Sequence, residues 1–565
     1  MGCSETKSVS TIEQVSSMEN SRELRPIENH ILICLVNAST SAMIKNIAKN
    51  LRQIICTIKI FSDANKCMKF IESITEEKIF LIITPEMDPA IRSVYYLSQL
   101  ERIYAFYGSP SHMIGTDDEN IQKKNFSNID KLCEQLERDV KLCSLDLLNI
   151  IVVPAEAQQI SPDSTSRKQV AMFLCTQLVK QIAVRIKFEN NHKSVFVDFC
   201  RTHYEQMNEQ MNDIDDFDKN YRPKSVLLWM TKPSFVSRML HRVLRTYEID
   251  VIYKMGFIIK HIHTQLTLLH ENIPAVLKNN IAVYRSKSLS NAEFDTLIKK
   301  NCDGLLSFSN FITATIHREK AVDFLRHRVM AHPKMIAVLF EIYFEATDRS
   351  AGNVCAVLNN SNSIIEPEDE TICFTMGTVF RIKSIVEETL DQSMNIWIVR
   401  LTFVDDSDQY FCRLTEPLRS NDVETNPLSY LGKLLIEMGA CDRAERFYLD
   451  LLSDPSVYGQ PRRLARLHNG LGVIFTFKGE HLKALAHYET SLKTSLDYMT
   501  PDHPDLAPIY KLMGDSCFNN QNYAQALQHY ERSIQLVNNQ SKQQVDHSFI
   551  DNLKNSIDKT KQLLA

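Results

Sequence analysis

The chain has 565 residues, 44% of them hydrophobic and 24% charged, which is the composition of a folded protein with about three to five domains. Glycine is rare: only 14 residues occur, where average usage of about 7% predicts around 40. This shortage favours helix-rich domains. Neither G-x-G-x-x-G nor G-x-x-x-x-G-K-[ST] occurs, which excludes the glycine loops of Rossmann-type and P-loop nucleotide sites. A net charge of −5 without a long basic block excludes nucleic acid as the main partner.

The cysteines and the lengths of the apolar runs indicate the cellular compartment in which the protein is expected. The 14 cysteines are scattered and form no C-x-x-C string, which is typical of reduced thiols in an intracellular protein. No apolar run approaches the roughly 20 residues that span a bilayer, and residues 1–28 lack the apolar core of a signal peptide. We therefore expect a cytoplasmic protein with a disordered leader over residues 1–28.

The first six residues, Met1-Gly2-Cys3-Ser4-Glu5-Thr6, fit the pattern for N-myristoylation. Gly2 is the candidate acceptor, and Cys3 is placed for palmitoylation. Two acyl chains would anchor the protein stably where one would not. The alternative is an unmodified leader, so we expect membrane anchoring only if Gly2 and Cys3 are acylated.

Residues 29–153 alternate short apolar runs with amphipathic stretches, which predicts an α/β module around a small parallel sheet. A phospho-receiver domain would need acidic residues after the first and third strands, where this chain has Asn37-Ala38-Ser39 and Thr84-Pro85-Glu86. The pattern therefore favours an adaptor or packing module, and its role stays open. The predicted strands are Ile31–Val36, Ile58–Phe61, Ile79–Ile83 and Ile103–Tyr107, and the predicted helices include Ala42–Arg52 and Asn65–Ile74.

The stretch Pro154–Arg167 is rich in Pro, Ser, Gln and Asp and is predicted to be a linker. Helical patterns follow it as far as about Leu269. The last helical stretch contains His261, His263 and His270, but a facing pair such as H-E-x-x-H is absent, so we expect no metal. The predicted helices are Val170–Ile186, Val195–Asn212, Phe235–Arg245 and Val251–His270.

A self-similar pattern occupies the C-terminal region. The dipeptides Leu431-Gly432, Leu471-Gly472 and Met513-Gly514 are each followed by Ala 12 residues after the Gly and by Tyr 16 residues after it. This spacing resembles the tetratricopeptide repeat, in which Gly and Ala let two antiparallel helices approach. The insertion Thr500–Ala507 resembles the longer connections of kinesin-light-chain repeats. We expect residues 425–565 to form an all-α solenoid of three repeats that binds a peptide or protein, with a purely structural extension as the alternative.

Three polar strings precede the repeats in a strand-rich region. The first is Val283-Tyr284-Arg285, with Arg285 ending an apolar strand. The second is Thr313-Ala314-Thr315, which precedes a predicted helix over Glu319–Arg328. The third contains Glu368-Asp369-Glu370; on a strand, Glu368 and Glu370 share a face and repel each other, which makes one of them an acid/base candidate.

In this order, the three strings resemble the R-S-E class of mono-ADP-ribosyltransferases, whose signature is a strand Arg, a Ser-x-Ser-like string and Glu-x-Glu. The continuation Met376-Gly377-Thr378-Val379-Phe380-Arg381-Ile382 is also similar to that family. The resemblance covers residues 165–415 and implies an α+β ADP-ribosyltransferase domain. It implies a helical subdomain over residues 168–275 and an NAD-binding sheet over 280–415. Members with a preceding α/β module and following tetratricopeptide repeats have a similar arrangement.

The resemblance implies transfer of ADP-ribose from NAD, as co-substrate, to an arginine of a protein acceptor. Arg285 would bind the NAD diphosphate, because a guanidinium can form bidentate bonds to phosphate oxygens. Glu370, matching the second Glu of the motif, would stabilise positive charge at the ribose C1′ atom, and Glu368 would orient the acceptor guanidinium. Thr313 would hydrogen-bond Glu370 or the nicotinamide ribose. Tyr284 and Thr315 are the further predicted NAD-binding residues.

Two positions depart from the family pattern. Thr313-Ala314-Thr315 replaces Ser-Thr-Ser, and Ser286 replaces the Gly that usually follows the Arg. Thr313 keeps a hydroxyl group, but β-branching restricts its χ1 angle and can misdirect the donor. Two alternatives therefore stay open: an inactive transferase fold that serves as a scaffold for the repeats, and an NAD glycohydrolase. The choice between NAD and NADP is also open.

Overall fold

The computed structural model describes residues 27–107, 123–155, 164–185, 192–205, 207–270, 282–343, 354–358, 371–391, 394–420, 423, 427–453, 459–538 and 547–564. These residues form two compact units. Unit 1 comprises the residues up to Leu145 together with Glu189–Arg242, and unit 2 comprises Asp146–Phe188 and Val243–Ala565. The predicted helical subdomain over residues 168–275 is thus divided between the two units.

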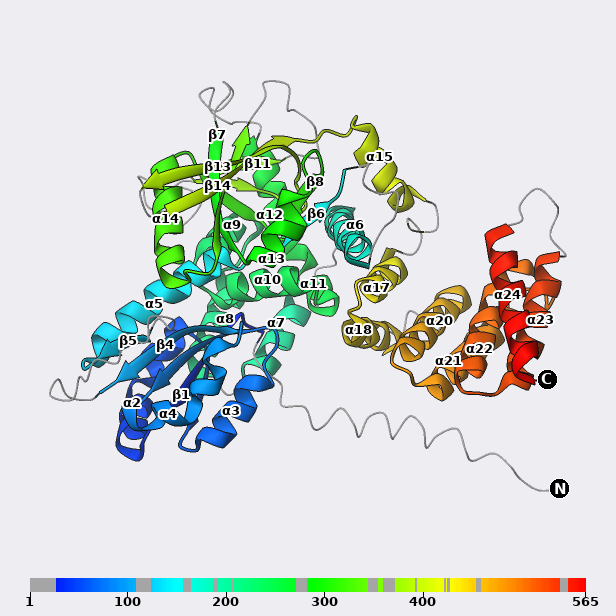
Figure 1. Cartoon of the computed structure of the whole chain (residues 1–565), viewed down its shortest axis with the longest axis horizontal. Coiled ribbons are helices and arrows are strands. Elements are labelled where there is room, and N and C mark those ends of the chain that lie inside the picture. The colour runs from blue at the N-terminus through cyan, green and yellow to red at the C-terminus, as the bar shows by residue number, and fades with distance from the viewer. Residues whose placement is uncertain are drawn as a thin grey trace. The chain divides into compact units, whose positions relative to one another are not determined.

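Unit 1 contains a five-stranded parallel sheet with the order β2-β1-β3-β4-β5, of which Figure 1 labels β1, β4 and β5. The predicted parallel sheet is confirmed over its first four strands. The fifth strand was not predicted because it is short and begins with two lysines. The strands are β1 (His30–Leu35), β2 (Thr57–Phe61), β3 (Lys78–Ile83), β4 (Leu100–Phe106) and β5 (Lys123–Phe126).

The three central strands of unit 1, β1, β3 and β4, are almost completely buried because both faces of the sheet are covered. On one face, residues of β1, β3 and β4 pack against Cys67 and Ile71 of the helix α3 (Ala64–Glu72). On the other face, the Tyr104 hydroxyl donates to the Asp139 carboxylate of α5 over 2.9 Å. Unit 1 also contains the segment after residue 189, where Gln210 Nε2 donates to Cys56 Sγ over 2.9 Å. The helices are α2 (Ala38–Ile54), α3 (Ala64–Glu72), η2 (Pro85–Met87), α4 (Asp88–Ile91), η3 (Arg92–Tyr96), α5 (Ile129–Asp146), α7 (His192–His203), α8 (Asn208–Asn220), η6 (Pro223–Ser225), α9 (Val226–Thr231) and α10 (Phe235–Thr246).

Unit 2 contains a nine-stranded mixed sheet with the order β11-β12-β9-β7-β10-β14-β13-β8-β6. Among the pairings of this sheet's described strands, only that of β10 with β14 is parallel. Ile150–Val153, which we assigned to the N-terminal module, is the edge strand β6 of this sheet and pairs with β8. The strands are β6 (Ile150–Val153), β7 (Ala282–Leu289), β8 (Leu305–Phe308), β9 (Ile312–Thr315), β10 (Ile336–Tyr343), β11 (Cys355–Leu358), β12 (Thr371–Phe374), β13 (Val379–Asp391) and β14 (Met394–Phe403).

Helices flank this sheet, and α14 covers part of one face. Ala321, Val322 and Leu325 of α14 pack against Leu339 and Ile398 on that face. The other face contributes Val283, Phe340 and Phe380 to the main core of the unit. The helices before the repeats are α6 (Ser164–Arg185), α11 (Ile249–Lys254), α12 (Gly256–His270), α13 (Asn291–Glu293), the π-helix η8 (Phe294–Lys299), α14 (Arg318–Ala331), α15 (Gln409–Thr415) and η9 (Glu416–Arg419).

Two predicted helices are broken in the structure. The stretch Val195–Asn212 is divided into α7 and α8, with the break after His203. The stretch Val251–His270 is divided into α11 and α12 at Met255, directly before Gly256. Glycine is among the weakest helix formers, which explains why the second break falls there.

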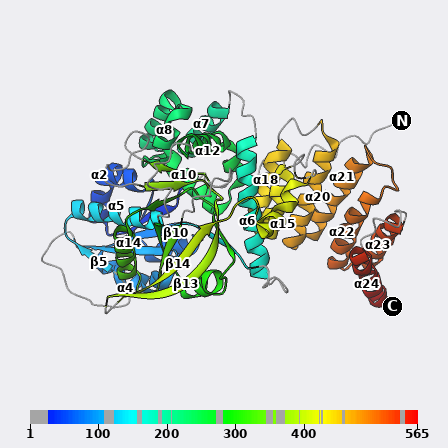
Figure 2. The same cartoon turned by 90° about the horizontal axis from the view of Figure 1, so that it is seen from above.

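The C-terminal helices form successive antiparallel pairs (Figure 2). In each of three pairs, the small residue predicted to allow close approach meets the predicted tyrosine. A Cβ atom at Gly472 would lie 2.4 Å from the Tyr488 ring, and Gly432 and Gly514 meet Tyr448 and Tyr530 in the same way. The helices are α17 (Pro427–Glu437), α18 (Cys441–Ser453), α20 (Pro461–Phe477), α21 (His481–Leu496), η10 (Pro504–Leu506), α22 (Ala507–Asn519), α23 (Tyr523–Asn538) and α24 (His547–Leu564).

Two further findings concern the described residues as a whole. None of their helices combines the length and the apolar character needed to cross a membrane. Their cysteines are free thiols, and several of them, such as Cys34 and Cys175, are buried. The acylation candidates Gly2 and Cys3 lie outside the described residues.

Candidate functional site

The strands that carry or follow the three polar strings are neighbours in the nine-stranded sheet. β9 lies between β7, which carries Arg285, and β12, which begins directly after Glu370. Arg285 is the fourth residue of β7 rather than its last, because the strand continues to Leu289. The sheet order therefore brings together segments that are separated by other strands and a helix in the sequence.

Arg285 and Thr313 are in direct contact. The Nη1 atom of Arg285 donates to the backbone carbonyl of Thr313 over 3.0 Å and lies 3.4 Å from the Thr313 hydroxyl oxygen. Both side chains are half-buried. A guanidinium has five N–H donors in a planar fork, which suits it to bind a carboxylate or a phosphate through two bonds.

Burial lowers the pKa of Arg285 to about 10, and the Asp146 carboxylate partly opposes this shift. Arg285 therefore stays cationic at neutral pH. Lys287, two residues along the same strand, also has a lowered pKa because burial outweighs the carboxylates of Asp146 and Glu293. A cation in these surroundings gains from an anionic ligand, because desolvated charges attract each other more strongly than charges in water.

Asp146 forms ion pairs with two further cations, Lys287 and Arg328. Its carboxylate accepts from Arg328 Nη2 over 2.9 Å and from the Ser288 backbone N–H over 2.8 Å, and lies 3.8 Å from Lys287 Nζ. Burial alone would raise its pKa, but Lys287, Arg328 and Ser288 outweigh burial and hold the pKa below its ordinary value. Lys287 and Arg328 thus share the buried Asp146 carboxylate, whose charge also acts on Arg285.

Tyr284 and Thr315 occupy a different part of the sheet surface from Arg285. Tyr284 packs with the apolar residues under α14, and its neighbour Arg285 points to the opposite face because side chains alternate along a strand. The Thr315 hydroxyl accepts from the His317 backbone N–H over 3.1 Å and so supports the turn before α14. The structure therefore brings Thr313 to Arg285 but does not bring Tyr284 to their contact.

A polar row crosses the sheet in register with Tyr284. Thr371 of β12 pairs with Thr315 of β9, Thr315 pairs with Tyr284 of β7, and Tyr284 pairs with Glu341 of β10. Residues that pair directly across strands share one face of the sheet. The row therefore extends from the start of β12, next to Glu370 in the sequence, to the buried carboxylate of Glu341.

Glu341 is held by cations and a tyrosine. Its carboxylate accepts from Arg400 Nε over 3.3 Å and from the Tyr343 hydroxyl over 3.1 Å, and lies 3.9 Å from Arg318 Nε. Burial raises the pKa of Tyr284, and the Glu341 charge raises it further, so this hydroxyl stays protonated at neutral pH. Tyr284 can consequently donate a hydrogen bond but cannot act as a base there.

Glu368 and Glu370, the predicted acceptor-orienting and catalytic residues, lie outside the described residues. What the structure gives is the position of Thr371, which follows Glu370 and pairs with Thr315. Three of the charged residues beneath or beside the site, Asp146, Arg328 and Glu341, were not predicted. No motif or spacing marks them, because their contacts depend on the sheet order.

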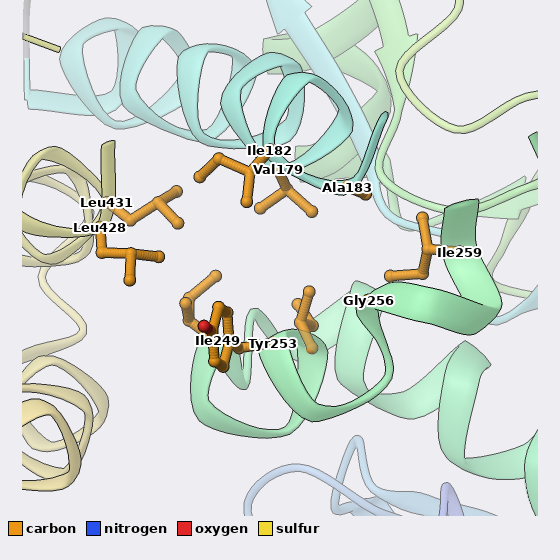
Figure 3. A pocket seen from close by; sticks show the side chains of 10 residues that line it. Val179, Ile182, Ala183, Ile249, Tyr253, Gly256, Ile259, Leu428 and Leu431 are labelled. Atoms are coloured by element: carbon orange, nitrogen blue, oxygen red, sulfur yellow. The ribbon is translucent and has the colours of Figure 1, made fainter. Parts of the chain in front are cut away.

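A pocket in unit 2 has none of the predicted site residues in its lining (Figure 3). It is lined by helices α6, α11, α12 and α17, and only Tyr253 among its ten lining residues has a polar side chain. Such a lining cannot satisfy the charges of a dinucleotide. The pocket lining consists of Val179, Ile182, Ala183, Ile249, Ile252, Tyr253, Gly256, Ile259, Leu428 and Leu431.

The histidines of α12 belong to no cluster of metal-ligating side chains among the described residues. In the described part of the chain, no group of three or more His, Cys, Asp or Glu side chains is placed to hold a metal ion. His263 Nδ1 lies 3.1 Å from the Thr375 hydroxyl, and His270 Nδ1 lies 2.9 Å from the Cys355 carbonyl. These two histidines connect α12 to β11 and to the residue that follows β12.

Comparison with known families identifies the middle part of the C-terminal helical region. A family model described as tetratricopeptide repeat matches residues 463–539, which covers α20 to α23. The two helix pairs in this range contain the Gly472–Tyr488 and Gly514–Tyr530 contacts. The tetratricopeptide prediction is thereby confirmed for this part of the chain.

Comparison with solved structures gives distant resemblances. BtubC (BKLC) from P. vanneervenii has a TM-score of 0.24 and 20% identity, over 27% of this chain and 62% of that one. The enzymatic component C2-I of the C2-toxin from Clostridium botulinum, at pH 6.1, has a TM-score of 0.21 and 11% identity, over 36% of this chain and 46% of that one. The chain thus spans less than two thirds of either protein, and at these scores neither resemblance assigns an activity. No curated protein matches the chain.

Proposed function

We propose that the chain transfers the ADP-ribosyl group of NAD to an arginine side chain of a protein, and that it uses Arg285, Thr313, Glu368 and Glu370. The observation that carries this proposal is the contact between Arg285 Nη1 and Thr313 on adjacent strands. Two of the three ordered motif strings meet there, and the third precedes the strand that pairs with β9.

The charges at the site fit the diphosphate of NAD. Arg285, Lys287 and Arg328 all interact with the Asp146 charge, and the Arg285 guanidinium would attract the anionic diphosphate. The Arg285 guanidinium would bind two phosphate oxygens with a pair of its five N–H donors. This mode of binding needs no glycine loop.

In the proposed reaction, the bond between nicotinamide and the ribose C1′ atom breaks, and nicotinamide leaves with the electron pair. A nitrogen of the acceptor guanidinium forms the new bond to C1′ and loses a proton. The Glu370 carboxylate stabilises the positive charge that develops at C1′. Glu368 holds the acceptor guanidinium and accepts its proton, because a guanidinium with a pKa above about 12 is a poor nucleophile until a carboxylate orients it.

The repeats would bind the acceptor protein or a peptide of another partner. Tetratricopeptide arrays form extended concave surfaces that bind peptides, which supports this role. The match to the tetratricopeptide family over residues 463–539 is the observation behind it. The reaction and the repeat-mediated docking are separate parts of the proposal and can fail separately.

The test of the reaction is labelled-NAD incorporation into polyarginine or histone by the wild-type chain and by Glu370→Gln. Gln keeps the size of the side chain and removes the charge, so we expect incorporation to fall by about 100-fold or more. Equal incorporation by both proteins would refute the enzyme. Running NAD and NADP in parallel establishes which dinucleotide is used.

Glu368→Gln separates arginine transfer from NAD hydrolysis. If the chain transfers ADP-ribose to arginine, this variant loses acceptor modification and keeps part of the nicotinamide release. If the chain is an NAD glycohydrolase, nicotinamide release changes little and wild-type acceptor modification is already absent.

A scaffold without catalysis is the second candidate. Two observations favour it: the tetratricopeptide match, and the Thr313 side chain, whose extra methyl group restricts the hydroxyl that would assist Glu370. Thr313→Ser removes this methyl group. Activity that appears only in Thr313→Ser would identify the wild-type chain as a scaffold, whereas activity in wild type that equals or exceeds that of Thr313→Ser would not.

A further inference from the structure

The carboxyl ends of the parallel strands in unit 1 form an edge to which no function has been given. The strand order β2-β1-β3-β4-β5 places β1 and β3 side by side, although the chain visits β2 between them. In open α/β sheets, ligands bind beyond the carboxyl ends of the strands at such a change of direction. The ends of β1 and β3 are joined there, because the Thr84 backbone N–H donates to the Leu35 carbonyl over 3.2 Å.

The N-terminus of α2 lies at this edge, directly after β1. The helix has 17 residues, and its first turn contains no acidic residue. Asn37 caps it by accepting from the Thr40 backbone N–H over 2.9 Å. The first N–H groups of a helix have no acceptor within the helix itself. Backbone N–H groups and the helix dipole together attract anions to such an end. Thr40 and Ser41 add two half-exposed hydroxyl side chains to this turn.

Thr84, at the end of β3, gives a second and independent indication. Its side chain is 2% exposed, and its hydroxyl oxygen has no hydrogen-bond partner among the described residues. Thr84 stands at the N-cap of the short helix η2, yet its side chain makes no capping hydrogen bond. Buried hydroxyl groups without a partner are rare because they lose their hydrogen bonds to water and gain none. A ligand at this edge could supply the missing partner.

The residue types at the edge fit an anion better than a cation. A cation site would need carboxylates after β1 and β3, and those positions hold Asn37 and Thr84. The exposed side chain of Glu86 is the nearest carboxylate in the sequence after β3. We propose that the Asn37–Ser41 turn of α2 and the Thr84 hydroxyl bind the phosphate group of a small phosphomonoester. This site does not depend on the proposed transferase activity.

The test is calorimetric titration of the full chain with inorganic phosphate and, separately, with glycerol 3-phosphate. Thr40→Glu places a carboxylate in the first turn of α2, where it suits the helix dipole but repels an anion. Thr40→Gln is the matched neutral control. We expect saturable binding by wild type and Thr40→Gln, and affinity at least about tenfold lower for Thr40→Glu. Equal affinity of the two variants, or no saturable binding by wild type, would overturn the proposal.

Two more variants locate the binding. Thr84→Val keeps the shape of the buried side chain and removes its hydroxyl, and we expect it to weaken phosphate binding several-fold while circular dichroism stays unchanged. Arg285→Gln alters the proposed NAD site and should leave phosphate binding as in wild type. Loss of phosphate binding in Arg285→Gln would place the anion in unit 2 and overturn the proposal. Tighter binding of glycerol 3-phosphate than of phosphate identifies an ester as the ligand, and equal binding identifies phosphate itself.

Discussion

The repeat region and the nine-stranded sheet differ in the sequence distance over which their contacts form. Gly472 meets Tyr488 on the next helix of the chain, and the same spacing recurs in the neighbouring helix pairs. At the proposed site, Arg285 contacts a residue 28 positions away, and Asp146 contacts Arg328 across 182 positions. A short sequence period therefore determines packing in the repeats, whereas the order of strands determines which residues meet in the sheet.

The variant Asp146→Asn tests the contacts in the nine-stranded sheet between residues that are far apart in the sequence. The variant keeps the shape of the side chain but leaves Lys287 and Arg328 buried without their carboxylate. Removing one partner of a buried ion pair costs about 3–5 kcal/mol, which is the largest effect predicted here. Denaturant unfolding followed by tryptophan fluorescence measures it, because Trp397 lies in this sheet.

The matched control is Asp295→Asn, which breaks an exposed pair with Lys299 at 3.8 Å. Exposed pairs contribute less than about 1 kcal/mol, so this variant should unfold almost as wild type does. The pH dependence gives a second readout. Because the folded-state pKa of Asp146 is lowered, its stabilisation is present above its ordinary pKa of about 3.9 and is lost as the pH falls through the folded value. The Asp146→Asn variant should not show this loss of stability at acid pH.

Arg285→Gln tests whether the Arg285–Thr313 contact belongs to an NAD site. Losing the charge-assisted bonds to the diphosphate should cost about 2–3 kcal/mol of transition-state binding, or roughly a 100-fold fall in kcat/KM for NAD. Arg326→Gln, which breaks an exposed pair with Asp323 on α14, is the control. A change of less than about threefold in Arg285→Gln would show that Arg285 does not bind NAD.

Arg285 and Asp146 differ in how far the sequence alone could predict their place in the structure. The apolar runs predicted the first four strands of the parallel sheet, because buried parallel strands are continuous hydrophobic segments. The order of three motif strings predicted that Arg285 and Thr313 belong together. Asp146 could not be predicted, because it precedes β6 in a segment that we assigned to the N-terminal module. Nothing local indicates that β6 pairs with β8.

The variant Gly472→Ala tests the contacts in the repeats between helices that follow each other in the sequence. The added methyl carbon would lie 2.4 Å from the Tyr488 ring, so the two helices must separate or the ring must move. Overpacking of this kind costs about 1–3 kcal/mol. Gly459→Ala, which adds a methyl group with no atom within 4 Å, is the control and should leave the thermal unfolding midpoint almost unchanged.

A double-mutant cycle makes this test specific to the predicted pair. Combining Gly472→Ala with Tyr488→Leu removes the ring that the methyl group would meet, so the double variant should lose less stability than the sum of the single variants. Strict additivity would show that Gly472 is needed for a reason other than its approach to Tyr488. The spacing of 16 residues would then have predicted the right residues for the wrong cause.

The smallest predicted effect concerns a histidine pair that breaks the equivalence of the repeats. His468 and His487 face each other with 3.1 Å between their Nδ1 atoms, and burial together with the His487 charge lowers the pKa of His468 to about 4. Burial also lowers the pKa of His487, although Glu445 opposes this. In the next repeat the corresponding rings are Tyr510 and His529.

Because the folded-state pKa of His468 is lowered, the unfolded chain binds more protons between about pH 6.5 and pH 4, and the stability of the repeats falls as the pH falls through this window. His468→Tyr reproduces the tyrosine–histidine pair of the next repeat and should flatten the dependence by about 1 kcal/mol or less, since both rings are partly exposed to solvent. Unfolding midpoints between pH 4 and pH 7 measure it. Parallel pH profiles of wild type and variant would mean that the pair is not titrated on unfolding. A flatter profile would show that two repeats with the same backbone spacing differ in their response to acid through one side chain.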